Sequence, residues 1–242
     1  MNQIEGKVAL ITGASEGIGR AIALALAGYG AKLALNARRA EKLAQVSESL
    51  KAKGSQVLAV SGDVSKVKDV ERLKSAVLEE FGHVDILVNN VGVGKYGPVV
   101  SSSIEDYDWI MNTNMRSSYL VTRAFLTEML ERKEGWVIFI ASVAGLRGLP
   151  NEAIYCASKC AQVGFAQALD YEVRQHGIKV TVVAPGATKT EFAIGTGRTR
   201  GDPKLEEYSD PESTADAVVF ALQQPPKTRV FLIGMRPMVE AL

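Results

Sequence analysis

Two kinds of hydrophobic pattern alternate along this chain. Short apolar runs, typical of strands buried on both faces of a sheet, are followed by longer segments whose apolar residues recur about every three to four positions, as in helices. The predicted strands are residues 7–11, 33–36, 56–60, 85–88, 136–140, 179–183 and 229–233. The predicted helices are residues 18–29, 41–53, 66–81, 104–132, 153–176 and 211–223. Because the two types alternate to the end, the pattern predicts a parallel sheet with helices on both faces.

One stretch, residues 187–210, has no periodicity and contains Gly195, Gly197 and Gly201. Long aperiodic loops in compact domains are usually functional or disordered, so we expect this lid segment (187–210) to be a mobile cover over a substrate. The rest of the chain shows no repeat, low-complexity segment or linker. We therefore expect residues 1–242 to form a single domain.

Composition narrows the classes of function. The chain has 242 residues, of which 47% are hydrophobic, and a net charge of +1 without a basic stripe, which argues against a nucleic-acid partner. No run of about 18 apolar residues predicts a membrane span, and no signal peptide is visible. Cys156 and Cys160 stand four positions apart without a nearby histidine, so we expect free thiols, no metal site and a cytoplasmic protein.

The strongest local motif joins the first strand to the first helix. Gly13 can form the tight turn that ends the strand, Gly17 allows backbone to approach a pyrophosphate, and Gly19 allows the helix to pack close to the strand. The N–H groups at the start of the helix would then face an anion. This arrangement predicts nucleotide binding, although the spacing is Gly-x-x-x-Gly-x-Gly rather than Gly-x-Gly-x-x-Gly.

A second motif places a phenol and an ammonium on one helix face, because Tyr155 and Lys159 are four residues apart. A tyrosine with a reference pKa near 10 must shift by roughly 3 pKa units to transfer protons near neutral pH, and a neighbouring lysine cation favours the phenolate. Taken alone, the pair could equally be a core tyrosine beside a surface lysine.

Further motifs stand in the same order as in a known family. Ser142 lies thirteen positions before Tyr155, and Asn89-Asn90-x-Gly92 follows the fourth predicted strand. Together with the glycine loop and the Tyr-x-x-x-Lys pair, they make the chain resemble the short-chain dehydrogenase/reductase family over essentially its whole length. The resemblance implies an α/β fold, a single-domain Rossmann-type doubly wound structure with seven parallel strands in the order 3-2-1-4-5-6-7.

The resemblance also implies a catalytic tetrad. Tyr155 would be the general acid in carbonyl reduction, and Ser142 would hold the substrate carbonyl. Lys159 would lower the pKa of Tyr155 and hold the nicotinamide ribose. Asn114 matches the family's helix asparagine, which holds a water in a proton relay to that lysine. Asn112 is a competing candidate, and Asn114 could instead be a helix-surface amide.

A nicotinamide cofactor site follows from the same resemblance. Asp63 matches the aspartate that contacts adenine, and Thr190 would meet the nicotinamide carboxamide and phosphate with nearby backbone. The implied cofactor-binding residues are Gly13, Ser15, Glu16, Gly17, Ile18, Gly19, Arg38, Arg39, Asp63, Val64, Asn90, Gly92, Tyr155, Lys159, Pro185, Gly186, Thr188 and Thr190. Val91 replaces the usual alanine, a small steric change.

The cofactor preference is predicted from the end of the second strand. An NAD enzyme of this fold places Asp or Glu there, but this chain has Ala37 followed by Arg38 and Arg39. A guanidinium pair at a helix start, where the helix already carries positive partial charge, is better explained by a bound anion than by solvated residues. We therefore expect NADP(H), although Glu16 stands where some NADP enzymes carry a second basic residue.

The expected function is reduction of a ketone or aldehyde, or oxidation of the matching alcohol, with a small carbonyl compound or a 3-hydroxy/3-oxo acid as substrate. A 3-oxoacyl-thioester (acyl-carrier-protein) reductase is the alternative, although residues 234–238 lack the Gly-Gly turn common in such reductases. A catalytically silent NADP(H)-sensing protein is the hypothesis from another class, and the complete tetrad argues against it. Arg147, Glu152 and Phe192 are candidates for the substrate pocket.

We also expect a homo-oligomer, a tetramer formed through the predicted helices 104–132 and 153–176, as the resemblance suggests. Two apolar pairs at helical spacing, Phe125 with Met129 and Phe165 with Leu169, could serve a symmetric interface. The alternative is that these four side chains lie in the subunit's own core.

Overall fold

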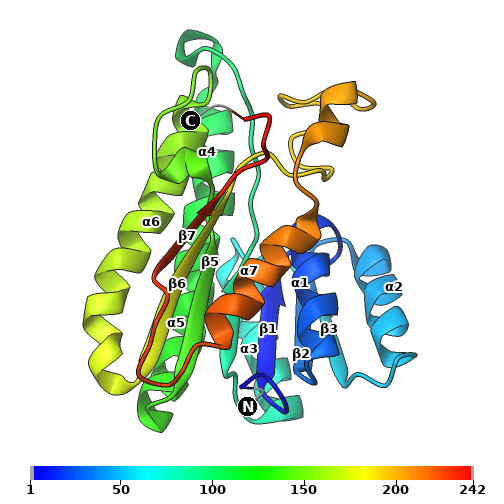
Figure 1. The fold of residues 1–242 in the computed structure, drawn as a ribbon, viewed down its shortest axis with the longest axis vertical. Coiled ribbons are helices and arrows are strands. Elements are labelled where there is room, and N and C mark those ends of the chain that lie inside the picture. Colours follow the sequence, from blue (N-terminus) through cyan, green and yellow to red (C-terminus); the bar gives the residue numbers. More distant parts are fainter. Residues whose placement is uncertain (1–2, 241–242) are drawn as a thin grey trace.

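The computed structural model describes residues 3–240 and contains one seven-stranded sheet. All the strand pairs are parallel, and the order β3-β2-β1-β4-β5-β6-β7 confirms the predicted topology (Figure 1). The strands are β1 (Val8–Thr12), β2 (Lys32–Ala37), β3 (Val57–Ser61), β4 (Ile86–Asn89), β5 (Gly135–Ile140), β6 (Ile178–Pro185) and β7 (Leu232–Met235).

Helices cover both faces of the sheet. One face carries the helices α1 (Gly17–Gly28), α2 (Ala40–Lys51) and α7 (Pro211–Leu222), and α7 lies against α1 (Figure 1). The opposite face carries α3 (Val67–Phe81), α5 (Ser117–Arg132) and α6 (Ala153–Val173), and α4 (Ile104–Met111) precedes α5. Each layer of helices closes its own apolar core against the sheet.

The central strand β1 shows why the apolar runs form strands. All five of its residues are buried, and they alternate between the two cores. Ala9 and Ile11 face the core under α1, α2 and α7, whereas Val8 and Leu10 face the other core. A strand with helices on both faces has no solvent side, so its sequence is continuously apolar rather than alternating.

The helix predicted over residues 104–132 is interrupted by a π-helical turn, η2 (Asn112–Arg116), between α4 and α5. The start of α4 is fixed by a capping box in which the Ser103 Oγ accepts from the Asp106 N–H. Single π turns inside α-helices are rare and often occur at functional sites. This one contains Asn114.

The predicted strand 229–233 is shifted, because β7 is Leu232–Met235. Arg229 is held by its guanidinium on the Asp170 carboxylate, with N–O distances of 2.9 and 3.0 Å. The Val230 carbonyl accepts from the Thr181 hydroxyl at 2.7 Å. These side-chain bonds hold residues 229–230 in place before the β6–β7 pairing begins. The strand β7 then continues to Gly234 and Met235, which pair with Ala184 and Pro185.

The apolar pairs considered for a subunit interface lie in the core instead. Phe125, Met129 and Leu169 are at most 4% exposed, and Phe165 packs edge-on against Phe139. Phe125, Met129 and Leu169 are therefore core residues, whereas Phe165 is only partly buried and its ring also packs against the exposed Tyr119. In the part of the chain that the structure describes, no helix is both long and apolar enough to cross a membrane. Cys156 is buried, Cys160 is exposed, and both are unbridged.

Candidate active site

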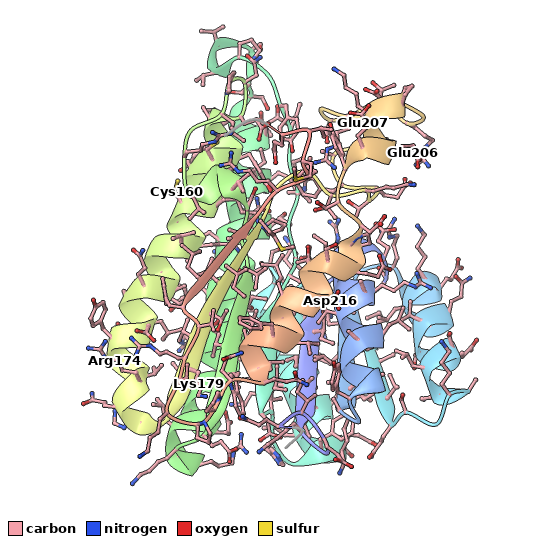
Figure 2. All side chains as sticks on the ribbon, viewed as in Figure 1. Cys160, Arg174, Lys179, Glu206, Glu207 and Asp216 are labelled. Carbon is pink, nitrogen blue, oxygen red and sulfur yellow. The ribbon has the colours of Figure 1, made fainter. Side chains whose placement is uncertain are left out.

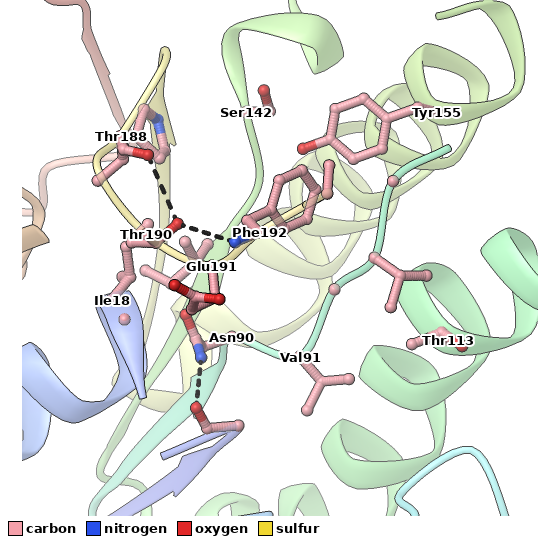
Figure 3. A pocket seen from close by; sticks show the side chains of 18 of the residues that line it. Ile18, Asn90, Val91, Thr113, Ser142, Tyr155, Thr188, Thr190, Glu191 and Phe192 are labelled. Carbon is pink, nitrogen blue, oxygen red and sulfur yellow. Dashed lines mark hydrogen bonds between the residues drawn. The ribbon is translucent and has the colours of Figure 1, made fainter. Parts of the chain in front are cut away.

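A large cleft lies at the carboxyl end of the sheet, with a volume of about 940 Å³. The segments that follow β1, β2, β3, β4, β5 and β6 all contribute to its lining, as expected for a ligand site of a doubly wound sheet. Figure 3 shows part of this lining, with Ser142 and Tyr155 at one end and Ile18 and Asn90 at the other. Of the catalytic and cofactor-binding residues proposed from the sequence, all but two line the cleft. The exceptions are Gly19 and Asn114, which lie behind its wall.

The glycine loop has the backbone that its sequence requires. Gly13 and Gly17 adopt φ values of +68° and +53°, in the left-handed region that favours glycine. A Cβ on Gly19 would collide with the Gly13 carbonyl, so α1 can approach the strand only because this residue has no side chain. The first turn of α1 contains no acidic residue and its N-cap, Glu16, makes no capping hydrogen bond. The backbone N–H groups at the start of α1 therefore remain available to bind an anion.

Asn90 supports this loop rather than pointing into the cleft. Its amide donates to the Thr12 carbonyl at 2.9 Å and to the Gly13 carbonyl at 3.3 Å. The Thr12 hydroxyl in turn donates to the Val88 carbonyl and accepts from the Asn90 N–H. Thr12 was absent from the predicted site, although its place at the end of β1 beside the Asn-Asn motif was a usable signal. Thr12 and Asn90 together hold the carboxyl ends of β1 and β4 next to each other beneath the site.

The basic residues after β2 have different surroundings. Arg39 forms an ion pair with Glu16, which also accepts from Lys42 at 2.9 Å. Burial disfavours the Glu16 anion, but these two hydrogen bonds outweigh it and lower the pKa of Glu16. Within residues 3–240, Arg38 makes no ion pair or hydrogen bond and is exposed at the cleft edge. Arg38 is thus the free guanidinium at the end of β2.

Two more segments form the nucleotide half of the cleft. One carboxylate oxygen of Asp63 accepts from the N–H and the hydroxyl of Ser65, at 3.0 and 2.7 Å, which fixes the orientation of the other oxygen. Val64, next to it, is buried. After β6, Thr190 accepts from the Phe192 N–H at 3.3 Å and donates to the Thr188 carbonyl, as Figure 3 shows. These local bonds shape the turn that closes the cleft.

The hydroxyl groups of Ser142 and Tyr155 face each other at the other end of the cleft (Figure 3). Ser142 follows β5, and its Oγ accepts from the Ala144 N–H at 3.1 Å, so its proton is free to be donated. Tyr155 is 6% exposed, in the first turn of α6. Burial raises the pKa of Tyr155 above its ordinary value, and the hydrogen bond with Ser142 opposes this rise. The phenol therefore holds its proton in the cofactor-free protein.

Lys159 lies on the same face of α6 as Tyr155, as its spacing predicted, and is 3% exposed. Its ammonium donates to the Ile140 carbonyl at 3.1 Å and to Gln162 Oε1 at 2.8 Å, and lies 5.9 Å from the centre of the Tyr155 ring. Burial lowers the pKa of Lys159 to about 7. A lysine with this pKa beside a phenol is typical of a proton-transfer site.

Asn114 is fully buried in the π turn, so it is not the helix-surface amide considered as the alternative. Its side chain forms two hydrogen bonds with the segment after β4. Oδ1 accepts from the Val93 N–H at 2.7 Å, and Nδ2 donates to the Val93 carbonyl at 2.9 Å. Nδ2 also donates to Ser158 Oγ at 2.9 Å. These bonds fix the segment carrying Gly92 against α6.

The substrate half of the cleft has aromatic walls. The rings of Tyr96 and Phe192 lie 5.9 and 5.6 Å from the Tyr155 ring, and Arg198 lies over the rings of Phe192 and Tyr208. The Glu152 carboxyl also lines it, and burial raises the pKa of this group while Arg198 opposes the rise. Tyr96, Arg198 and Tyr208 were missed individually, because loops outside periodic segments give no sequence signal for contact. Arg147, a candidate from the sequence, lies outside this lining.

Comparison with known proteins decides the family. The sequence pattern of the short chain dehydrogenase family matches residues 7–201. The chain belongs to this family. It is 36% identical over 237 residues to a sepiapterin reductase of Chlorobaculum tepidum, covering 95% of this chain and 96% of that protein.

Solved structures of this short chain dehydrogenase family agree. The alcohol dehydrogenase of the archaeon Thermococcus sibiricus, solved with 5-hydroxy-NADP, has a TM-score of 0.90 and 32% identity, with 98% of this chain and 99% of that chain covered. A family member from Burkholderia phymatum, solved with NAD, has a TM-score of 0.87 and 32% identity, with 97% and 90% covered. The chain is thus an oxidoreductase of a family whose structures hold nicotinamide cofactors.

The residues of this chain fit such a cofactor. Gly17 of the glycine loop leaves room beside Thr190, another lining residue, because a Cβ at Gly17 would lie 3.1 Å from Thr190 Cγ2. Gly92 leaves room beside the Lys159 ammonium, where a Cβ would lie at 3.3 Å. Between these points the cleft runs without interruption past Arg38, Asp63 and Thr188.

Proposed function

We propose that the protein is an NADP(H)-dependent oxidoreductase that interconverts a small carbonyl compound and its alcohol, with Tyr155 as proton donor and acceptor. The observation that carries this proposal is the pair of facing hydroxyls, Ser142 and Tyr155, with the buried Lys159 ammonium behind them. A protein that only senses the nucleotide could use the lysine to hold the ribose, but it has no use for two hydroxyl groups that face each other in the cleft beside that lysine.

When bound, the cofactor supplies or accepts a hydride at its nicotinamide ring. In our proposal Ser142 donates a hydrogen bond to the carbonyl oxygen and so sets its distance from Tyr155. Tyr155 then transfers its phenolic proton to that oxygen as negative charge develops. The Lys159 cation stabilises the phenolate that is left, which Tyr155 requires because burial raises its pKa.

Arg38 supports the preference for NADP(H). It is the cation without a partner at the end of β2, where a 2′-phosphate would lie, while Arg39 is paired with Glu16. The proposed contacts of the other nucleotide parts follow the cleft lining: the pyrophosphate at Gly13–Gly19, the adenine at Asp63 and Val64, and the nicotinamide at Pro185, Gly186, Thr188 and Thr190.

The lining of the substrate half supports a small uncharged carbonyl compound with a ring or apolar body. Tyr96 and Phe192 offer ring faces and edges for such a body. The positive charge of Arg198 is opposed there by the Glu152 and Glu240 carboxyl groups, so this half offers no net positive charge to the carboxylate of a 3-oxo acid. A 3-oxoacyl thioester is the alternative, and the relative named as a sepiapterin reductase supports a reductase in either case.

We further propose a homotetramer in the cytoplasm, a reducing compartment that suits the two unbridged cysteines. The helices α5 and α6 carry exposed tyrosines, Tyr119 and Tyr171, which replace the buried apolar pairs as interface candidates. Sedimentation equilibrium at micromolar concentration tests the assembly, and a monomer would contradict it.

The experiment that tests the function is a panel of carbonyl compounds with absorbance of the reduced cofactor followed over time. The panel contains aliphatic ketones, aryl ketones, 3-oxo acids with their methyl esters, and a 3-oxoacyl thioester, each with NADPH and with NADH. We expect turnover of ketones with NADPH, faster for an ester than for its acid. Cofactor binding without turnover of any compound would favour the nucleotide-sensing alternative.

A further inference from the structure

One buried polar side chain near the site has no role in the mechanism above. Gln162 lies one helical turn after Lys159 on α6, is fully buried and does not line the cleft. Its Oε1 accepts from the Lys159 ammonium at 2.8 Å. Its Nε2 donates to the Asn114 carbonyl at 3.0 Å and to Ser118 Oγ at 2.7 Å. The amide thus connects the π turn with the lysine.

These bonds restrict the direction of the ammonium. An ammonium has three N–H donors, of which the Ile140 carbonyl and Gln162 Oε1 accept two. With two donors fixed by buried acceptors from β5 and α6, the tetrahedral geometry of nitrogen sets the direction of the third. The third donor remains for the cleft side, where Gly92 and the Tyr155 ring lie.

The carbonyl of Asn114 is also used. It accepts from Gln162 Nε2 and from the Ser118 hydroxyl at 3.0 Å, and a carbonyl oxygen offers two lone pairs. The family resemblance assigns the link between this asparagine and the lysine to a water. In this chain a side-chain amide lies between the Asn114 carbonyl and the Lys159 ammonium.

Both acceptors of the ammonium are neutral, and the nearest titratable group is Tyr155 on the same helix. From the other elements around the cleft, the charged groups that act on Tyr155 are Glu152 and Arg198. A carboxylate in the place of Gln162 would hold the cation more strongly, whereas an amide leaves the lysine able to lose its proton near neutral pH.

We propose that Gln162 is a positioning residue, which fixes the Lys159 ammonium toward Tyr155 and the cofactor ribose by tying it to the Asn114 carbonyl of the π turn. This rests on the proposed function, in which Lys159 assists Tyr155. Gln162 itself touches neither substrate nor cofactor and acts only through the lysine.

The test compares two substitutions and a matched control. Gln162→Glu keeps an acceptor for Lys159 and adds a charge, and Gln162→Met removes the amide from an unbranched side chain of similar length. Ser118→Ala removes the hydroxyl that accepts from Gln162 Nε2 and leaves both acceptors of the Lys159 ammonium in place. The first measurement uses cofactor-free protein with ¹³C-labelled lysine, in which NMR follows the titration of Lys159, assigned by the signal that Lys159→Met lacks.

We expect Gln162→Glu to raise the pKa of Lys159 and Gln162→Met to lower it, each by about 1, because hydrogen bonding and opposite charge favour the ammonium. Ser118→Ala leaves it unchanged. The kcat–pH profile with NADPH moves in the same two directions, and Gln162→Met loses about tenfold in kcat.

The proposal is overturned if the Lys159 titration and the pH profile are the same in all variants while their unfolding midpoints fall together, since Gln162 would then only pack the core. If Gln162→Met does not fold, the direction of the shift in Gln162→Glu decides alone. The absence of turnover in the wild type would refute the proposed function, whereas the NMR titration would still decide whether Gln162 holds Lys159.

Discussion

Glu16, the N-cap of α1, forms an ion pair with Arg39, the N-cap of α2. The carboxylate also binds Lys42, so one anion pairs with two cations at the mouth of the nucleotide half. Arg38 has no such partner among the described residues and, in our proposal, binds the 2′-phosphate. The relationship makes cofactor preference depend on charges that can be altered one at a time.

We predict that Glu16→Gln strengthens NADPH binding. The change releases Arg39 and Lys42 for the 2′-phosphate and removes a negative charge near the pyrophosphate, so the Kd for NADPH should fall by about 3- to 10-fold at low salt and the gain should shrink as salt rises. Fluorescence titration at two ionic strengths measures this. Weaker binding of NADPH would show that the ion pair organises the loop instead.

The complementary change is Arg38→Ala. A contact between charged groups contributes roughly 1.5–3 kcal/mol, so NADPH should bind about 10- to 150-fold more weakly while NADH is nearly unchanged. The measurement is kcat/KM with each cofactor on one carbonyl substrate. Equal efficiency of the two cofactors in the wild type would refute the NADP(H) assignment, and Lys51→Ala, at the far end of α2, is the matched control.

Tyr155→Phe should keep cofactor binding and lose at least about 100-fold in kcat, because the ring still packs against Tyr96 and Phe192 but has no proton to transfer. Stopped-flow turnover and an NADPH titration separate the two effects. Retention of more than about a tenth of the wild-type kcat would mean that another group supplies the proton.

Lys159→Met should abolish turnover and stabilise the fold. Burial lowers the pKa of Lys159 from its ordinary value of 10.5 to about 7 in the folded protein. The buried ammonium therefore destabilises the folded state at low pH. Between these two values the unfolded chain binds more protons, and the stability of the wild type rises with pH through this group.

The free energy of unfolding of Lys159→Met should therefore exceed that of the wild type most below pH 7. This difference should shrink toward zero as the pH approaches 10.5. Urea unfolding of cofactor-free protein at a series of pH values measures it. A variant that is less stable than the wild type at every pH would show that the hydrogen bonds of Lys159 outweigh its burial.

The lid segment is predicted to open and close over the substrate. It carries Phe192 and Arg198 of the cleft wall and the short helix η5 (Pro203–Glu207), and Figure 2 shows Glu206 and Glu207 on η5 beyond α7. Within it Lys189 pairs with Glu206. Thr196 joins the lid to the segment 94–96, because its hydroxyl donates to the Gly94 carbonyl and its carbonyl accepts from the Tyr96 N–H. Limited proteolysis should cut it less with NADPH and a product analogue present. Equal cleavage in both conditions would contradict a moving lid.

How much of the site the sequence predicts depends on how local its cause is. The strand pattern, the glycine positions and the i, i+4 pairing of Tyr155 with Lys159 follow from backbone geometry within a few residues. The structure has them where they were predicted, except that β7 begins later than the predicted strand. Periodicity also showed which helix faces are apolar, but not what covers them. Phe125 and Met129 fitted an interface as well as a core until the sheet was seen to bury them.

The sequence by itself determined the fold and pointed to the candidate ligand edge and the candidate chemistry-bearing residues, because each depends on short-range patterns. Only the tertiary structure decided that Arg39 is paired and Arg38 free, that Asn90 supports the glycine loop, and that Gln162 joins Lys159 to Asn114. These are contacts between side chains from different elements, up to 78 positions apart in the chain. Their partners are set by packing of whole helices against the sheet, which no local pattern encodes.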